Sequence, residues 1–176
     1  MRNDTTYDFG NPCTITMTAW FNVSDISDYQ YITSIYDSGN AKVCGMALFI
    51  NTGKLYLFDT NNAFTADTAS LGDGQWHQAV GIINGNQRIT YIDGKRVLYE
   101  DNAGTQPNMS STSRLSIGHY NYQNNLNYSW KGKLSLVRYS KAMPSAEQVK
   151  KMYEEEKPLF YKNAKATLFG SSPIVT

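Results

Sequence analysis

The 176-residue chain has no apolar run that approaches the roughly 20 residues needed to cross a bilayer. Its charge is balanced, because 16 Lys and Arg residues oppose 15 Asp and Glu residues and leave a net charge of +1. Proteins that bind nucleic acid need a concentrated basic face, so this balance argues against such a partner. The polar N-terminus predicts no secretory signal peptide, and we expect no membrane partner.

Cysteine and histidine are scarce. Cys13 and Cys44 are the only cysteines, and neither belongs to a CxxC motif or a Cys/His cluster. Their place in strand-like runs favours buried thiols, and one disulfide is the alternative. The two histidines, His77 and His119, are far apart in the sequence. No zinc-type ligand pattern is present.

The common catalytic motifs are also missing. The sequence has no GxSxG, phosphate loop, HExxH or Ser-His-Asp motif. Glycoside hydrolysis needs two positioned carboxylates. Of the five glutamates, however, all but Glu100 fall in a C-terminal helical segment, and residues 133–139 contain no acid. We therefore predict that the chain is not an enzyme and needs no cofactor.

What the chain does have is a series of short segments with strand-like patterns. Residues 13–23 alternate in the way that is typical of a strand. One face is expected to carry Cys13, Ile15, Met17, Ala19, Phe21 and Val23, and the other Thr14, Thr16, Thr18, Trp20 and Asn22. Residues 74–94 predict a β-meander, because the dipeptides Asn84-Gly85 and Asp93-Gly94 favour two-residue hairpin turns. Other strands are predicted at residues 29–36, 43–50, 54–59, 96–100, 114–118 and 133–140, with loops at 61–74 and 119–130. This pattern predicts an all-β protein, an antiparallel β-sandwich.

A single helix is predicted near the C-terminus. Ser145 and Gln148 have the spacing of a capping box. Val149, Met152 and Tyr153 then form an apolar stripe, and Pro158 limits the length of the helix. The stripe must pack against the sandwich, because an isolated amphipathic helix cannot bury it. A further strand is predicted at residues 164–169.

Six segments, in this order, resemble the laminin-G-like, concanavalin A-like jelly-roll domains. They are residues 14–21 (TITMTAWF), 74–80 (GQWHQAV), 91–97 (YIDGKRV), 115–118 (LSIG), 130–139 (WKGKLSLVRY) and 142–153 (AMPSAEQVKKMY). The resemblance implies a domain over residues 1–160 with two antiparallel sheets and ligand sites in loops on the concave side. Residues 161–176 are then a C-terminal extension. Within this framework we expect Trp76 to fill the core and His77 to be hydrogen-bonded at a strand edge.

The Tyr- and Asn-rich segment 119–130 is the strongest candidate for a glycan site. Sugars bind to aromatic faces through their C–H surfaces and to carboxamides through their hydroxyl groups. The segment supplies both kinds of group and almost no charge, and Asp59 and Asn61 form a second candidate loop. The predicted carbohydrate-binding residues are Tyr120, Asn121, Tyr122, Asn124, Asn125, Tyr128, Asp59 and Asn61. The alternative is that the tyrosines pack on the sandwich or make a subunit contact.

Calcium is the metal that the resemblance implies, because many domains of this type bind it. Asp37, Asp59 and Asn61 could supply some of the oxygen ligands that calcium prefers. Ser135 and Leu136, however, stand where family members often carry acids. We therefore assign no metal ligand set.

These observations lead to a hypothesis about function. The C-terminal run EEEKPLFYKNAKATLFGSS resembles segments that follow such domains in phage virion proteins, especially tail and fibre components. We predict a non-catalytic recognition module for glycans or host-surface polysaccharide, in a phage or other surface structural protein. It would be located on a virion or an extracellular surface. The alternative is an assembly or decoration domain that binds no glycan and contacts neighbouring virion subunits or copies of itself.

Overall fold

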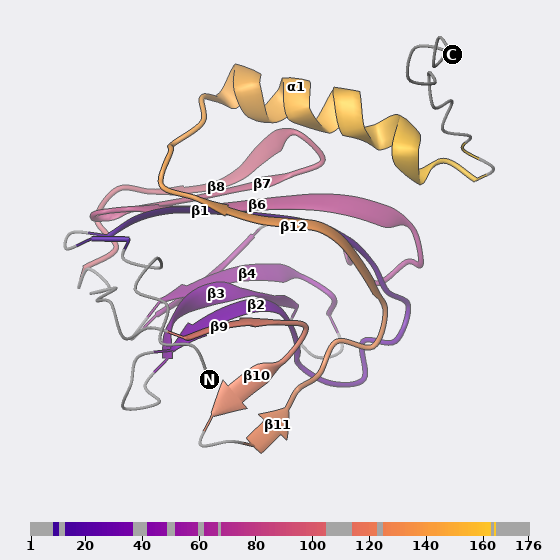
Figure 1. Cartoon of the computed structure of the whole chain (residues 1–176), viewed down its shortest axis with the longest axis horizontal. Helices are drawn as coiled ribbons and strands as arrows, with labels where there is room; N and C mark the ends of the chain where they lie inside the picture. The colour runs from indigo at the N-terminus through magenta and orange to yellow at the C-terminus, as the bar shows by residue number, and fades with distance from the viewer. Residues whose placement is uncertain are drawn as a thin grey trace, which may run out of the picture.

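The computed structural model describes residues 9–10, 13–36, 42–48, 52–59, 62–66, 68–104, 114–122, 125–162 and 164. Its strands form two five-stranded antiparallel sheets and one small hairpin, with a helix on the outside (Figure 1). The expected all-β sandwich with one short C-terminal helix is confirmed. Among the described residues, no helix has the length and apolar character that crossing a membrane requires.

The first sheet has the strand order β12-β1-β6-β7-β8. Its members are β1 (Thr14–Asn22), β6 (Trp76–Asn84), β7 (Gln87–Ile92), β8 (Lys95–Glu100) and β12 (Lys133–Ser140). Asp93 and Gly94 occupy the two-residue turn between β7 and β8, both with positive φ (50° and 74°), as the Asp-Gly dipeptide predicts. Between β6 and β7 the turn residues are Gly85 and Asn86, one position later than expected.

The second sheet has the strand order β5-β4-β3-β2-β9. It consists of β2 (Gln30–Tyr36), β3 (Lys42–Leu48), β4 (Leu55–Asp59), β5 (Ala63–Thr65) and β9 (Arg114–Ile117). Two of the predicted loops contain further strands. Strand β5 lies inside residues 61–74, and residues 119–130 contain the hairpin of β10 (Tyr120–Tyr122) and β11 (Asn125–Asn127).

The main core fills the space between the sheets. The inward positions of β1 are all fully buried there, together with the inward-facing apolar residues of β3 and β4. They include Cys13, Ile15, Met17, Ala19, Phe21, Cys44, Met46, Leu55 and Leu57. The alternation in residues 13–23 therefore predicted correctly which side chains face the core.

Helix α1 (Ala146–Glu156) covers the outer face of the first sheet (Figure 1). The capping box is present, because the Ser145 hydroxyl accepts a hydrogen bond from the Gln148 N–H and the Gln148 side chain accepts one from the Ser145 N–H. Val149 is buried in a second apolar cluster with Val80, Ile82 and other residues of β6 and β7. A 3₁₀-helix, η2 (Lys157–Phe160), carries Pro158 at its start and ends the helical segment. The predicted strand at 164–169 lies outside the described residues, apart from Ala164.

Trp76 does not fill the core, so that expectation is wrong. Both faces of β6 are covered, and Trp76 lies half-buried on the outer face, where its ring packs against Phe160 at 4.6 Å. Trp20, which was expected to face away from the core, is 1% exposed because Phe160 and Tyr153 stack on it at 4.2 and 5.6 Å. Its indole N–H donates to Oε2 of Glu156 at 2.6 Å.

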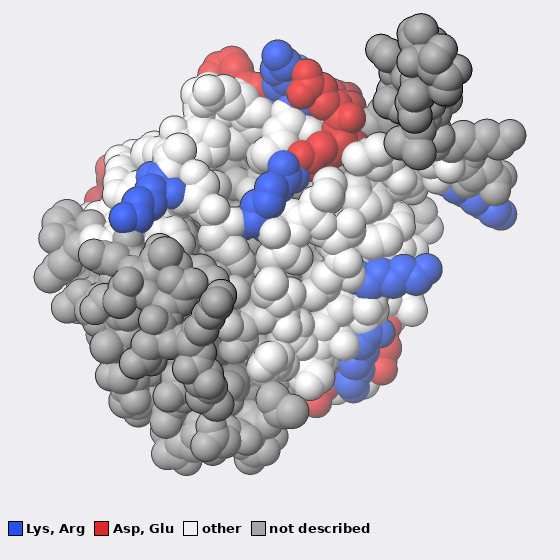
Figure 2. All heavy atoms as spheres, in the orientation of Figure 1, with Lys and Arg blue, Asp and Glu red and all other residues white. Residues whose placement is uncertain are grey.

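Charged side chains are unevenly distributed over the described surface. In Figure 2, acidic and basic residues gather along α1 at the top of the view, whereas the face below is mostly uncharged. This matches the balanced composition and the charge-rich helix of the sequence.

Candidate functional site

A cluster of aromatic rings lies on the outer face of the second sheet. Along β4, Leu55 and Leu57 point into the main core, so Tyr56 and Phe58 point to the opposite face. There they pack with Tyr31 of β2, and Tyr29 packs against their edge. We call Tyr29, Tyr31, Tyr56, Phe58 and Tyr128 the tyrosine cluster.

Tyr128 is the accessible member of the tyrosine cluster. Its ring centroid lies 5.9 Å from that of Tyr29 and 6.3 Å from that of Tyr31. Tyr31 in turn packs edge-on against Phe58 at 5.3 Å. Tyr128 is 42% exposed, whereas Tyr31, Tyr56 and Phe58 are at most 8% exposed. The cluster therefore offers the Tyr128 ring to solvent, with Tyr29 partly exposed beside it and buried rings beneath.

The backbone holds Tyr128 in an unusual conformation. It follows β11 directly and has a φ of 57°, which is uncommon for a residue with a large side chain. Its carbonyl accepts a hydrogen bond from the Tyr31 N–H at 3.2 Å, and the Trp130 N–H donates to the Gly118 carbonyl at 2.7 Å. These bonds fix the end of the β10–β11 hairpin against β2, which positions the exposed ring.

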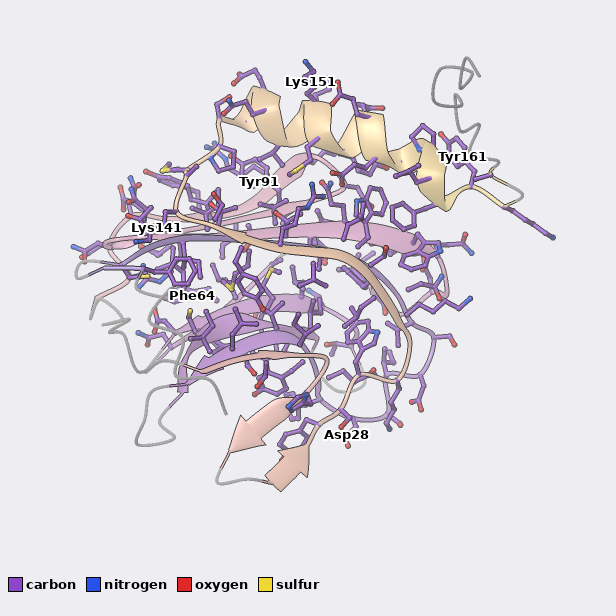
Figure 3. All side chains as sticks on the ribbon, viewed as in Figure 1. Asp28, Phe64, Tyr91, Lys141, Lys151 and Tyr161 are labelled. Carbon is purple, nitrogen blue, oxygen red and sulfur yellow. The ribbon has the colours of Figure 1, made fainter. Side chains whose placement is uncertain are left out.

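A hydrogen-bond network joins the segments that follow Tyr128 and precede Tyr29. The side chain of Gln30, fully buried, accepts a hydrogen bond from the Lys131 N–H at 2.8 Å and donates to the Asp25 carbonyl. Lys131 Nζ donates to the Ser27 hydroxyl at 3.1 Å, and hydrogen bonds from Ser27 hold the pKa of Asp25 below its usual value. Figure 3 labels Asp28 in this region, close to the hairpin. Ser27 and Asp28 directly precede Tyr29, and Lys131 follows Tyr128 by three residues, so the segments that flank the two rings carry hydroxyl, carboxylate and ammonium groups.

The structure brings part of the predicted glycan site together. Tyr120, Asn121 and Tyr122 form β10, and in the hairpin Tyr122 is directly opposite Asn125 of β11. For these four residues only the backbone is described, and Asn124 and Asn61 lie outside the described residues. The position of Tyr128 agrees with a role in binding, which remains a prediction.

Asp59 does not join this surface. Its side chain is 1% exposed and points inward, where Oδ2 accepts a hydrogen bond from Nε of Arg88 at 2.8 Å. Its other oxygen accepts a bond from the Asn62 N–H at 3.1 Å. The expectation that Asp59 contacts a glycan is therefore corrected, because burial removes its carboxylate from solvent.

The sequence interpretation missed the supporting rings of the tyrosine cluster. The signal was present in the segment LYLFD, where Tyr56 and Phe58 alternate with Leu55 and Leu57. A strand that is apolar on both faces must be covered on both sides. Among the described residues, no group of three or more His, Cys, Asp or Glu side chains could hold a metal. Asp37, another of the considered calcium ligands, lies outside that range.

Solved structures of related shape come from several organisms. A heptameric SAP-like pentraxin from Limulus polyphemus shares 16% identity, with a TM-score of 0.65 over 80% of this chain and 69% of its own. The CBM40 of the Ruminococcus gnavus IT-sialidase, bound to alpha2,3 sialyllactose, shares 12% identity, with a TM-score of 0.66 over 80% of this chain and 82% of its own. A Trypanosoma rangeli sialidase matches at 12% identity and a TM-score of 0.64, over 84% of this chain and 23% of its own.

At these identities the solved structures establish the fold alone. No curated protein matches the chain in sequence. A family model, however, matches residues 4–150, which is most of the chain. That match agrees with the two-sheet topology and with the resemblance of the six ordered sequence segments. The chain belongs to the concanavalin A-like lectin/glucanases superfamily, in its laminin-G-like family Laminin_G_3.

Proposed function

We propose that this domain is a non-catalytic carbohydrate-recognition module that binds its glycan at Tyr128 and the β10–β11 hairpin. The observation that carries the proposal is the exposed Tyr128 ring, which packs against Tyr29 and the buried Tyr31 and lies in a segment linked by hydrogen bonds to polar residues before Tyr29. Such a ring can stack on the C–H face of a sugar while nearby hydroxyls, amides and charges bind its hydroxyl groups.

The related structures support a carbohydrate ligand. They include the CBM40 with bound alpha2,3 sialyllactose, and the family takes its description from lectins and glucanases. A lectin role fits the described acids better than a glucanase role. Glycoside hydrolysis needs two carboxylates at the scissile bond, and the inward-facing acid of β4, Asp59, is held by Arg88.

We also propose that the domain is a module of a phage or other surface structural protein and is exposed on a virion or an extracellular surface. This part rests on the C-terminal sequence that resembles segments following such domains in virion proteins. An assembly or decoration role without a glycan is the alternative. It would use the same hairpin as a subunit contact.

A glycan array probed with the labelled protein tests the proposal. We expect selective binding to a set of related glycans, and loss of that binding in Tyr128→Ala. Light scattering on the same sample tests the alternative. A stable oligomer that binds no glycan on the array would favour the assembly role and contradict recognition.

A further inference from the structure

A pocket lies at the end of α1, on the outer face of the first sheet, whereas the tyrosine cluster is on the outer face of the second sheet. Its volume is about 420 Å³, which is within the range of roughly 300–1,000 Å³ typical of small-molecule sites. It is lined by residues of β1, β6 and the loop before β6, together with the C-terminal helical segment. The lining residues that matter for its chemistry are Trp20, Asn22, Gln75, Trp76, Lys157 and Tyr161, with Lys162 beside them.

Aromatic rings form much of this pocket. Trp20 is 1% exposed and stacks with Phe160, so its ring forms part of the floor of the pocket. Trp76 is half-buried and also packs against Phe160, with ring centroids 4.6 Å apart. Tyr161 is 57% exposed and lies where the chain leaves η2, at the end of the helical segment in Figure 3. Trp76 and Tyr161 therefore present ring surface that a sugar ring could stack against.

The charged residues that line this pocket are cations. They are Lys157 and Lys162, and none of the described lining residues is acidic. Lys157 lies with its Nζ 5.2 Å from the ring centre of Tyr153, which keeps the ammonium next to the pocket. The carboxylate of the adjacent Glu156 already accepts hydrogen bonds from Trp20, Gln78 and Arg138. An anionic group in the pocket would therefore face two cations and two carboxamides, those of Asn22 and Gln75.

We propose that this pocket binds a saccharide unit that carries a carboxylate. The ring would stack on Trp76 or Tyr161, the carboxylate would pair with Lys157 and Lys162, and the Asn22 and Gln75 amides would bind hydroxyl groups. This site is separate from the tyrosine cluster, and the inference does not depend on a glycan binding there. It would give the domain two binding surfaces on opposite sheets.

Isothermal titration calorimetry with trigalacturonate tests this proposal, with its methyl ester as the uncharged match. We expect trigalacturonate to bind more tightly than the ester. We expect Lys157→Gln and Lys162→Gln each to weaken that binding by about tenfold, which is the scale of one charge-assisted hydrogen bond. Lys151→Gln is the matched control, because Lys151 lies on the adjoining helix α1, is 75% exposed and points away from the sheet (Figure 3).

Three outcomes would overturn the proposal: no binding of trigalacturonate, equal binding of acid and ester, or binding that neither Lys157→Gln nor Lys162→Gln weakens. Tyr128→Ala separates this inference from the proposed function. Trigalacturonate binding that is lost in Tyr128→Ala but unchanged in Lys157→Gln would place the ligand at the tyrosine cluster. That result would reject the second site while supporting recognition by the first.

Discussion

Nε of Arg88 donates a hydrogen bond to Oδ2 of Asp59 across 2.8 Å, and both side chains are almost completely buried. Arg88 belongs to β7 of the first sheet and Asp59 to β4 of the second, so the pair joins the two layers of the sandwich. Nη1 of Arg88 also donates to the carbonyls of Gly85 and Gln87. The guanidinium is thus well supplied with acceptors, as a buried charge must be.

Asp59→Asn should be strongly destabilising. The substitution keeps an oxygen that can accept a hydrogen bond from the Asn62 N–H, but it removes the negative charge that faces the buried Arg88 guanidinium. We expect a loss of about 3–5 kcal/mol in the free energy of unfolding, measured by urea denaturation. Asp101→Asn, at an exposed position, should change it by less than about 0.5 kcal/mol.

A double variant tests whether the charge explains this loss. Asp59→Asn combined with Arg88→Met removes both charges, and it should be more stable than Asp59→Asn alone. If the free energy of unfolding of the double variant were lower than that of Asp59→Asn, the ion-pair explanation would fail.

His77 should make stability depend on pH. Burial tends to lower its pKa, but Asp93, at 2.8 Å from Nδ1, and Asp73, at 3.2 Å from Nε2, outweigh burial and raise the pKa above its usual value near 6.5. A raised pKa in the folded state means that protonated His77 stabilises the protein below about pH 6.5. This contribution is lost as the pH rises through the raised pKa.

The comparison of wild type with His77→Gln isolates this effect. The difference in their free energies of unfolding should be largest in mildly acidic buffer and should shrink as the pH rises above about 6.5. Chemical denaturation at a series of pH values measures it. Parallel curves for the two proteins across this window would show that the Asp73–His77–Asp93 contacts do not favour the imidazolium.

The two cysteines should be unreactive in the folded protein. Burial raises the pKa of Cys13 to about 12 and also raises that of Cys44, and the thiolate is the form that reacts. A colorimetric thiol reagent at mildly alkaline pH should detect no thiol in the native protein and both after unfolding in guanidinium chloride. Detection of neither thiol after unfolding without reductant would instead indicate the disulfide alternative.

Alternation along single strands predicted a large part of the fold. The pattern in β1 assigned Phe21 to the core and Trp20 to the other face, and both assignments are confirmed. The expectation that Trp76 fills the core followed from the family resemblance and was wrong, because β6 is covered on both faces, one against the core and one under α1 and η2. An alternation of apolar and polar residues cannot distinguish the two faces of a strand when both faces are covered.

Contacts between distant segments were the part that the sequence did not reveal. The Arg88–Asp59 pair joins residues 29 positions apart on different sheets, so local patterns do not show it. A hint existed, because Asp59 ends the otherwise apolar strand LYLFD, and a buried carboxylate needs a partner of opposite charge. The hairpin in residues 119–130 was missed because its strands are short and polar. The Tyr- and Asn-rich composition of this segment nevertheless marked it as a candidate binding site.

Binding at Tyr128 is the central claim, and calorimetric titration of a glycan selected on the array tests it most directly. Tyr128→Ala is compared with Tyr99→Ala, which removes another exposed tyrosine, 48% accessible, from the edge strand β8 of the other sheet. Loss of one stacking ring should weaken binding by about 1–3 kcal/mol in Tyr128→Ala and leave Tyr99→Ala at the wild-type affinity. Equal affinities for wild type and both variants would contradict glycan recognition at the tyrosine cluster.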